Sequence, residues 1–144
     1  MPVQNPPAGY HSVSPYLATV RVAKLVEFLE YVFDAKVTER MTRADGGIQH
    51  CELRIGDSIV MMGEPADPAS ARPSNLYVYV PDVDTTYRRA IERGAKSERE
   101  PANQFYGDRG AAFVDASDNH WWIATHVEDV SPEELQRRMQ SQKH

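Results

Sequence analysis

The sequence predicts an α+β fold made of two βαβββ modules that enclose a cleft. Strand and helix patterns follow the order β-α-β-β-β twice, with a linker between the copies at residues 65–74. The Ala35-Lys36 pair that follows the first helix recurs as Ala95-Lys96 after the second, about 60 residues later. Each half is too small to bury its own sheet face well, so we expect the halves to pair.

Composition and charge narrow the class of protein. The chain has 144 residues, of which 41% are hydrophobic and 26% charged, as in one compact globular unit or two small modules sharing a core. The net charge is −5 without any basic run, so we expect no nucleic-acid partner. No segment approaches the roughly 20 apolar residues of a membrane span, and residues 1–10 lack a signal-peptide core. Cys51 is the only cysteine, which favours a cytoplasmic protein with a small buried thiol.

The first module is expected at residues 10–64, after a proline-rich N-terminal arm at residues 1–9. Residues 11–19 suit a strand at a sheet edge, because Pro15 cannot donate to a ladder. Residues 22–33 place their apolar side chains on one helical stripe. The Asp-Gly and Gly-Asp turns then separate three strands, expected at residues 36–41, 50–55 and 58–62.

The second module is expected at residues 75–127 and repeats this order. Asp82 is a good N-cap for its helix and Gly94 a good C-terminal stop. Its strands are expected at residues 76–80, 96–99, 111–114 and 120–125. Residues 128–144 form a C-terminal helix and tail, because Ser131 and Glu134 make a capping box. A pair of ferredoxin-like units is the competing fold, but each half shows one helix, not two.

The order and spacing of several motifs carry a family resemblance. They are GYHSVSPYL (9–17), EFLEYVFDAK (27–36), LRIGDSIVMM (53–62), YVYVPDVDTTYRRAIERGAK (77–96), QFYGDRGAAFVD (104–115) and HWWIATHVEDVSPEEL (120–135). Together they resemble the vicinal oxygen chelate superfamily of glyoxalase I, fosfomycin and bleomycin resistance proteins and extradiol dioxygenases, most closely its PhnB-like branch. The resemblance implies an incomplete barrel around a cleft, the glyoxalase/bleomycin resistance fold. One departure is Asp34, which ends the first helix where that branch has glycine.

The resemblance also locates where a metal would bind. Metal-using members take His, Gln or Glu ligands from the first and fourth strands of each module, and the matching positions here are Ser14, Met61, Leu76 and Trp122. A hydroxyl, a thioether, an alkyl group and an indole do not make a site for a divalent metal. We therefore expect a cleft without metal or cofactor. A different metal site, made of His50, Glu52 or His120, is the alternative.

Without a metal, the cleft is expected to be mostly apolar and aromatic. Strand alternation places Tyr16 beside Ser14, and His120 beside Trp122. We also assign Met61 and Leu76 to the ligand-binding face. Trp122 and Tyr16 are suited to stack on a planar ligand or to lie over a cationic one, while Trp121 points to the opposite face.

Tyr106-Gly107-Asp108-Arg109 resembles a Trp-Gly-x-Arg stretch that leads into the seventh strand of bleomycin-resistance relatives. In the functional interpretation, Tyr106 and Arg109 bind the ligand, and Arg109 grips a carboxylate or phosphate with two hydrogen bonds. In the structural interpretation, the segment is a surface turn in which Arg109 has a structural partner.

Two functions of different class follow. The first is metal-independent binding of a small, partly aromatic or apolar molecule, as a sequestering or carrier protein of the bleomycin-resistance kind. The second is an enzyme. In a metal form it would be a glyoxalase-type lyase, an isomerase or a dioxygenase, and in a metal-free form it would use His120 as general base and Tyr106 or Arg109 to hold an oxyanion. A housekeeping protein with a vestigial pocket is a third possibility. The resemblance implies a homodimer.

Overall fold

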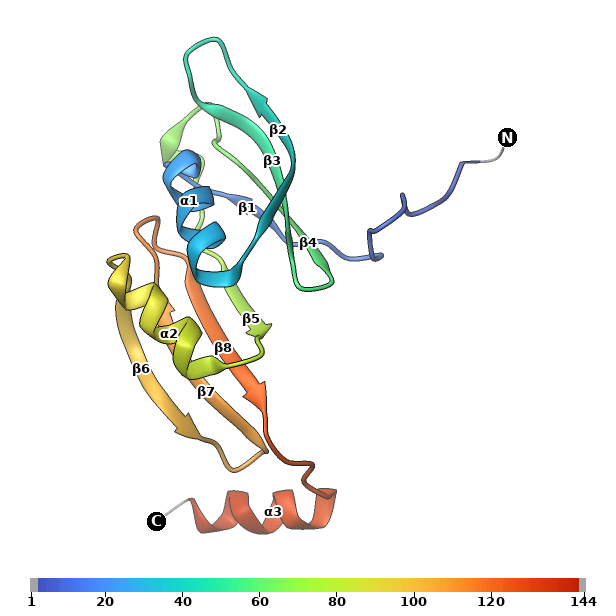
Figure 1. The fold of residues 1–144 in the computed structure, drawn as a ribbon, viewed down its shortest axis with the longest axis vertical. Coiled ribbons are helices and arrows are strands. Elements are labelled where there is room, and N and C mark those ends of the chain that lie inside the picture. Colours follow the sequence, from blue (N-terminus) through green and yellow to red (C-terminus); the bar gives the residue numbers. More distant parts are fainter. Residues whose placement is uncertain (1–2, 143–144) are drawn as a thin grey trace. The chain divides into compact units, whose positions relative to one another are not determined.

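A computed structural model describes residues 3–142 of the chain and confirms the predicted fold class (Figure 1). Two βαβββ units follow one another, and a C-terminal helix ends the described chain. The first unit runs to Ser74 and includes the turn Asp115–Asn119, while the second comprises Asn75–Val114 and the chain from His120 onward. Neither four-stranded sheet closes on itself.

The first unit is built on a sheet with the strand order β1-β4-β3-β2. Its strands are β1 (Tyr16–Ala18), β2 (Lys36–Thr42), β3 (Ile48–Ile55) and β4 (Ser58–Gly63). β1 runs parallel to β4, whereas β4 with β3 and β3 with β2 are antiparallel. The predicted strand at residues 11–19 is wrong in its first half. β1 begins only after Pro15, which has no N–H group to extend the ladder.

Helix α1 (Val22–Phe33) supplies the core of the first unit, as its apolar stripe predicts. Its buried side chains are Val22, Leu25, Val26, Leu29, Val32 and Phe33. Burying one such side chain stabilises the fold by about 1.5–3 kcal/mol. The helix ends at Asp34, whose φ of 54° lies in the left-handed region that glycine adopts without strain.

The second unit repeats the topology with the strand order β5-β8-β7-β6. Its strands are β5 (Asn75–Tyr79), β6 (Lys96–Asn103), β7 (Asp108–Val114) and β8 (His120–His126). β6 and β7 are longer than predicted. Pro101 is tolerated in β6 because this strand lies at the sheet edge.

Helix α2 (Val83–Glu92) packs on β6, β7 and β8 (Figure 1). The Asp82 side chain accepts hydrogen bonds from the backbone N–H groups of Asp84 and Thr85, which confirms the predicted cap. Phe113 and Trp121 are fully buried in this unit. The prediction that Trp121 faces away from Trp122 is therefore confirmed.

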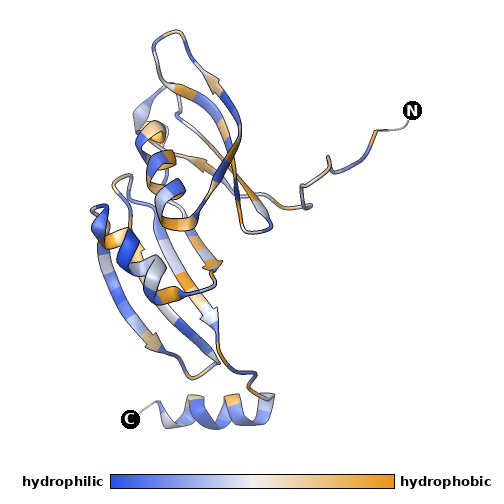
Figure 2. Cartoon of the chain, viewed as in Figure 1, coloured by the Kyte–Doolittle hydropathy of each residue, from blue (hydrophilic) through white to orange (hydrophobic). Residues whose placement is uncertain are grey.

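The chain after β8 leads to helix α3 (Pro132–Ser141), which Ser131 caps as predicted. None of its side chains is fully buried, and Figure 2 shows it as largely hydrophilic. Arg138 anchors it through hydrogen bonds to the Phe105 carbonyl at 3.0 Å and to Glu128 at 2.7 Å. The helix is thus held by polar contacts rather than by a shared core.

Gly107 lies where the chain leading to α3 crosses the start of β7. Its φ is +101°, and a Cβ atom there would lie 2.2 Å from the Glu128 carbonyl oxygen. The Gly107 carbonyl accepts from the N–H groups of Val127 at 2.9 Å and Glu128 at 3.1 Å. Only glycine permits this close approach.

Three smaller features complete the fold. A short 3₁₀ helix, η1 (Pro68–Ser70), lies in the predicted linker. Cys51 is buried, as predicted, and burial raises the pKa of its thiol. Within residues 3–142, none of the helices has the length and apolar character needed to cross a membrane.

Candidate functional site

An aromatic surface lies on the second sheet, on the face away from α2. Parallel pairing of β5 with β8 sets Tyr77 beside Trp122, and Tyr79 lies two residues further along β5. Tyr77 is 46% exposed, Tyr79 62% and Trp122 37%. The Tyr77 and Tyr79 rings lie 5.4 Å apart, tilted by 59°. We call these three rings the aromatic face.

A buried carboxylate fixes one side of the aromatic face. Asp108, only 3% exposed, accepts hydrogen bonds on Oδ2 from the hydroxyls of Tyr77 at 2.7 Å and Tyr79 at 2.9 Å. Its Oδ1 lies 2.8 Å from Nδ1 of His126, whose Nε2 lies 2.8 Å from the exposed carboxylate of Asp129. One carboxylate thereby orients two exposed phenol rings and one imidazole.

The charges of this network follow from its hydrogen bonds. Burial opposes ionisation of Asp108, but bonds from Tyr77, His126 and Tyr79 outweigh it and hold the pKa of this carboxyl below its usual range. The bond to Asp108, followed by the bond to Asp129, raises the pKa of His126. Burial and its bond to Asp108 raise the pKa of Tyr77, and a separate bond to the same carboxylate raises the pKa of Tyr79. The network therefore favours a carboxylate, neutral phenols and an imidazolium.

A second polar group lies along β8 on the same face of the sheet. His120 Nδ1 lies 2.8 Å from Oε1 of Glu98, and the two side chains are similarly exposed. The Arg99 guanidinium lies over the Trp122 ring at 5.5 Å from its centroid, within cation–π distance. Charged and aromatic groups thus meet at this end of the aromatic face.

The first unit carries a similar arrangement on its own sheet. The nearly buried Glu52 of β3 accepts from the Tyr10 hydroxyl and lies 2.7 Å from His50 Nε2. Burial opposes ionisation, yet the bonds from Tyr10 and His50 keep the pKa of Glu52 below its usual range. The Tyr16 ring stacks on His50 at 5.9 Å. Each unit thus has a buried carboxylate bound to a tyrosine and a histidine.

The residues predicted for the ligand site have different surroundings in the structure. In the first unit, Tyr16 is exposed and pairs with the half-buried Met61, while Ser14 precedes β1. In the second unit, His120 and Trp122 lie on one face, as predicted.

Leu76 does not share that face. It pairs with the buried Trp121, whereas Tyr77 pairs with Trp122. Paired residues of neighbouring strands point to the same side, so the predicted common face of Leu76 and Trp122 is wrong by one residue.

The segment from Tyr106 to Arg109 divides between two environments. Tyr106 is 38% exposed and lies close enough to Tyr77 to help raise the pKa of that phenol, which places it next to the aromatic face. Arg109 binds Asp84 of α2 with two hydrogen bonds, of 2.8 and 2.9 Å. The structural interpretation of Arg109 is therefore the better one, although its partner lies on α2.

Sequence reasoning missed several residues of this site. The structural interpretation places Asp108 in a surface turn, yet this residue begins β7 and is buried. Tyr77 and Tyr79 are not among the predicted site residues, which include Leu76 from this strand. Glu98 and Arg99 lie in a charged run that carries no aromatic or apolar signal. The alternation of tyrosines in LYVYV (76–80) is the sequence signal that indicates an aromatic face on this strand.

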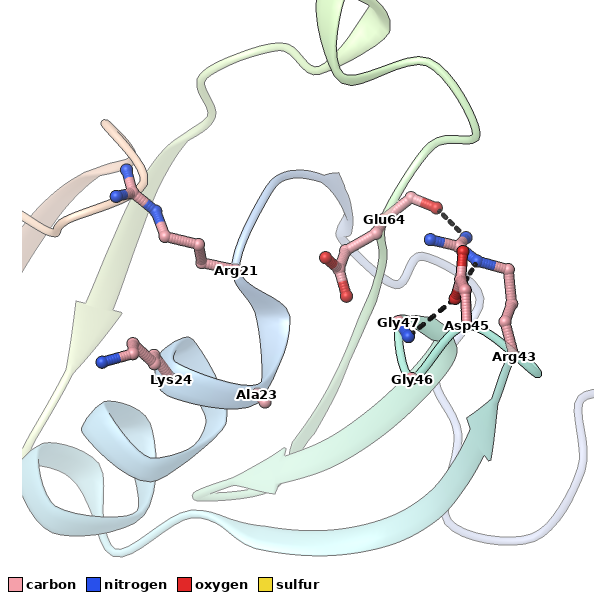
Figure 3. Close-up of a pocket in the computed structure, with 8 residues that line it drawn as sticks. All are labelled: Arg21, Ala23, Lys24, Arg43, Asp45, Gly46, Gly47 and Glu64. Carbon is pink, nitrogen blue, oxygen red and sulfur yellow. Dashed lines mark hydrogen bonds and ion pairs between the residues drawn. The ribbon is translucent and has the colours of Figure 1, made fainter.

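The first unit also contains a hollow of about 480 Å³ (Figure 3). Arg43 donates to the Glu64 carbonyl oxygen at 2.7 Å and lies 3.4 Å from Asp45. The hollow contains none of the predicted site residues and carries charges of both signs. Its lining residues are Arg21, Ala23, Lys24, Arg43, Asp45, Gly46, Gly47 and Glu64.

The residues present do not fit a metal ion at the positions that the resemblance implies. Met61 and Trp122 occupy two of these positions and offer a thioether and an indole, which are poor ligands for divalent metals. Among residues 3–142, no group of three or more His, Cys, Asp or Glu side chains is arranged to hold an ion. His50 and Glu52 bind each other directly.

Comparison with known proteins agrees with the family resemblance of the sequence motifs. Residues 10–123 match the Glyoxalase/Bleomycin resistance protein/Dioxygenase superfamily. The uncharacterized protein Rv0887c of Mycobacterium tuberculosis is 30% identical over 142 residues, which cover 91% of this chain and 84% of that protein.

Two solved structures share the fold. TioX from Micromonospora sp. ML1 has a TM-score of 0.65 at 24% identity, over 80% of this chain and 96% of TioX. The fosfomycin resistance protein FosX from Listeria monocytogenes, solved with Mn(II) and sulfate, has a TM-score of 0.64 at 14% identity, over 90% of this chain and 97% of FosX.

Proposed function

The chain belongs to the Glyoxalase/Bleomycin resistance protein/Dioxygenase superfamily, and on that premise we propose that it binds a small, partly aromatic molecule on the aromatic face of its second sheet. The observation that carries the proposal is the placement of Tyr77, Tyr79 and Trp122, three large rings exposed side by side on one face. Rings of this size usually lie inside a protein, so a group of exposed ones is typical of a binding surface.

The rings are suited to a planar ligand. A stacked aromatic pair contributes about 0.5–1.5 kcal/mol beyond the burial of its area. The Arg99 guanidinium, itself a planar group, already lies over Trp122. Asp108 fixes the hydroxyls of Tyr77 and Tyr79, so little side-chain freedom is lost when a ligand stacks there.

Binding on this face requires no metal ion in our proposal. Stacking and burial act through Trp122 and Tyr77, and the carboxylate of Asp108 is already engaged by three donors of the chain. FosX was solved with Mn(II), whereas Met61 and Trp122 stand at two positions that the resemblance assigns to metal ligands. We therefore propose a sequestering or carrier role, of the kind that bleomycin-resistance proteins have, rather than metal-dependent lyase or dioxygenase chemistry.

Two finer assignments belong to the same proposal. The order and spacing of the motifs between residues 9 and 135 favour the PhnB-like branch of the superfamily. A homodimer is proposed because two-module members of the family commonly dimerise.

Titration with two aromatic compounds tests the proposed binding. Binding of 1-anilinonaphthalene-8-sulfonate is followed by its fluorescence, and binding of bleomycin is measured by calorimetry. We expect saturable binding of at least one of them by the wild type, with strong weakening in Trp122→Ala and no change in the control Met139→Ala, which removes an exposed side chain on α3. Excess EDTA should leave both titrations unchanged. Equal binding by wild type and Trp122→Ala, or loss of binding in EDTA, would contradict the proposal.

A further inference from the structure

We propose that Glu98, His120 and Arg99 form a metal-free proton-transfer site that converts planar aromatic ketones to their enols. The proposal rests on the binding function above for one element only, the stacking of the substrate ring on Trp122. It adds a reaction, which follows from three charged or ionisable side chains at one end of the aromatic face.

A β-bulge in β6 brings two consecutive residues to this face. The pairing with β7 shifts between Ser97 and Arg99, so Glu98 is an extra residue without a partner. Ser97 points toward α2, because its hydroxyl accepts a 2.7 Å hydrogen bond from Tyr87 of that helix. Arg99, two residues later, lies on the opposite face over the Trp122 ring.

The bulge gives His120 a carboxylate partner. Glu98 Oε1 lies 2.8 Å from His120 Nδ1 and, as a carboxylate, can only accept, so Nδ1 carries the proton in the neutral ring. The lone pair then resides on Nε2, the ring nitrogen that Glu98 does not contact. A carboxylate that fixes the tautomer and orientation of an imidazole is the usual arrangement around a histidine general base. Glu98 is a positioning residue in this scheme.

Strand geometry places base, ring and cation around one substrate volume. His120 and Trp122 are two residues apart on β8, on the same face and about 7 Å apart. A ring stacked on Trp122 with a ketone side group can therefore present a C–H bond to His120. Arg99 reaches the Trp122 ring and can turn its guanidinium from the indole to the ketone oxygen.

The proposed step is balanced without a co-reactant. Nε2 of His120 takes a proton from the carbon next to the carbonyl, and the C–H electron pair becomes the C=C bond of the enolate. The carbonyl π pair moves to oxygen, where the Arg99 guanidinium stabilises the negative charge. Return of a proton to carbon regenerates the ketone, so in D₂O the substrate exchanges hydrogen for deuterium.

The test uses 2-indanone, a planar aryl-fused ketone with acidic C–H groups. Exchange of these hydrogens in D₂O is followed by proton NMR, with metal-free buffer and full-length protein. We expect wild-type protein to accelerate exchange over buffer, and His120→Asn to lose about 10²-fold of the protein-dependent rate, a typical effect of a general base. Arg99→Met should lower the rate, whereas Arg99→Lys should keep part of it.

Glu98→Gln separates positioning from structure, because it should lower kcat while leaving KM unchanged. His11→Asn, which alters an exposed histidine before β1, is the matched control and should exchange like the wild type. Displacement of 1-anilinonaphthalene-8-sulfonate by 2-indanone measures binding separately. Displacement with no exchange above buffer, or equal rates in His120→Asn and wild type, would overturn the proton-transfer proposal alone. If none of the aromatic compounds binds, the binding proposal is overturned, and this inference with it.

Discussion

Tyr77 donates a 2.7 Å hydrogen bond to Asp108, a carboxylate that opens β7 and is almost completely buried. Because the phenol proton points inward, the Tyr77 oxygen presents only lone pairs to solvent. Tyr79 makes the same bond to the same oxygen atom at 2.9 Å. The aromatic face thus consists of exposed rings whose hydroxyls are held by a buried carboxylate. Substitutions can test the rings and the carboxylate separately.

Trp121 and Trp122 are neighbours with opposite roles, which a pair of alanine variants can separate. Trp121→Ala removes a fully buried side chain and should lower the free energy of unfolding by about 3–5 kcal/mol. Trp122→Ala removes a partly exposed ring and should cost much less while weakening binding of aromatic compounds. Urea unfolding of both variants measures this difference. Equal destabilisation would mean that β8 has the opposite register.

Asp108→Asn should destabilise the second unit by about 1–3 kcal/mol. Asparagine keeps one accepting oxygen, but its amide nitrogen cannot accept, so either the Tyr77 and Tyr79 hydroxyls or His126 would face another donor at a buried position. Asp129→Asn is the matched control, because Asp129 is fully exposed and bonds only the outer nitrogen of His126. Chemical denaturation should show no measurable change for the control. A similar loss in both variants would argue against a special role of Asp108.

His126 should titrate above its ordinary pKa of 6.5, because Asp108 and Asp129 both favour the imidazolium. Since the folded protein holds this proton more tightly than the unfolded chain, the contribution to stability is complete below pH 6.5. It is lost as the pH rises through the raised pKa. NMR titration of the His126 ring measures the value, and Asp108→Asn should lower it more than Asp129→Asn does. A pKa below 6.5 in the wild type would contradict the two hydrogen bonds.

Asp34 ends α1 in a left-handed conformation, which glycine adopts more easily than any residue with a Cβ atom. Two variants, Asp34→Gly and Asp34→Ala, both lose the carboxylate and differ only in this Cβ atom. The glycine variant should be more stable by about 1 kcal/mol, because it alone avoids the clash. Thermal unfolding in parallel measures the difference, and an alanine variant as stable as the glycine variant would exclude strain at this position.

Arg109 and Asp84 should form a measurable structural pair. Their two hydrogen bonds join β7 to α2, but both side chains are partly exposed, so the coupling should be at most about 1 kcal/mol. A double-mutant cycle of Arg109→Met and Asp84→Asn, followed by urea unfolding, isolates this term. A coupling energy of zero would show that the pair contributes nothing to stability.

The order of helices and strands could be predicted because local signals agreed with the fold. Asp82 and Ser131 cap helices where the sequence indicates, and the stripe at residues 22–33 is buried as a set. The face of β5 could not be predicted. Leu76 and Tyr77 are both compatible with burial, and both pair with a tryptophan, so alternation alone does not distinguish the two sides.

Two other parts of the site depend on features that a sequence does not display. The bulge at Glu98 shifts the register by one residue, and nothing in the local sequence marks it. Asp108 looks like part of a polar turn, yet it is buried because three donors from β5 and β8 converge on it. Both depend on pairing between strands that are far apart in the chain.

At Gly107 the chain leading to the C-terminal helix passes the start of β7 so closely that there is no room for a Cβ atom. Any larger residue there would push away the backbone of Glu128, and with it the segment that Arg138 secures. Asp108 is the next residue, so the same displacement would reach the carboxylate under the tyrosines. A single substitution at Gly107 would then disturb the C-terminal helix and the aromatic face together.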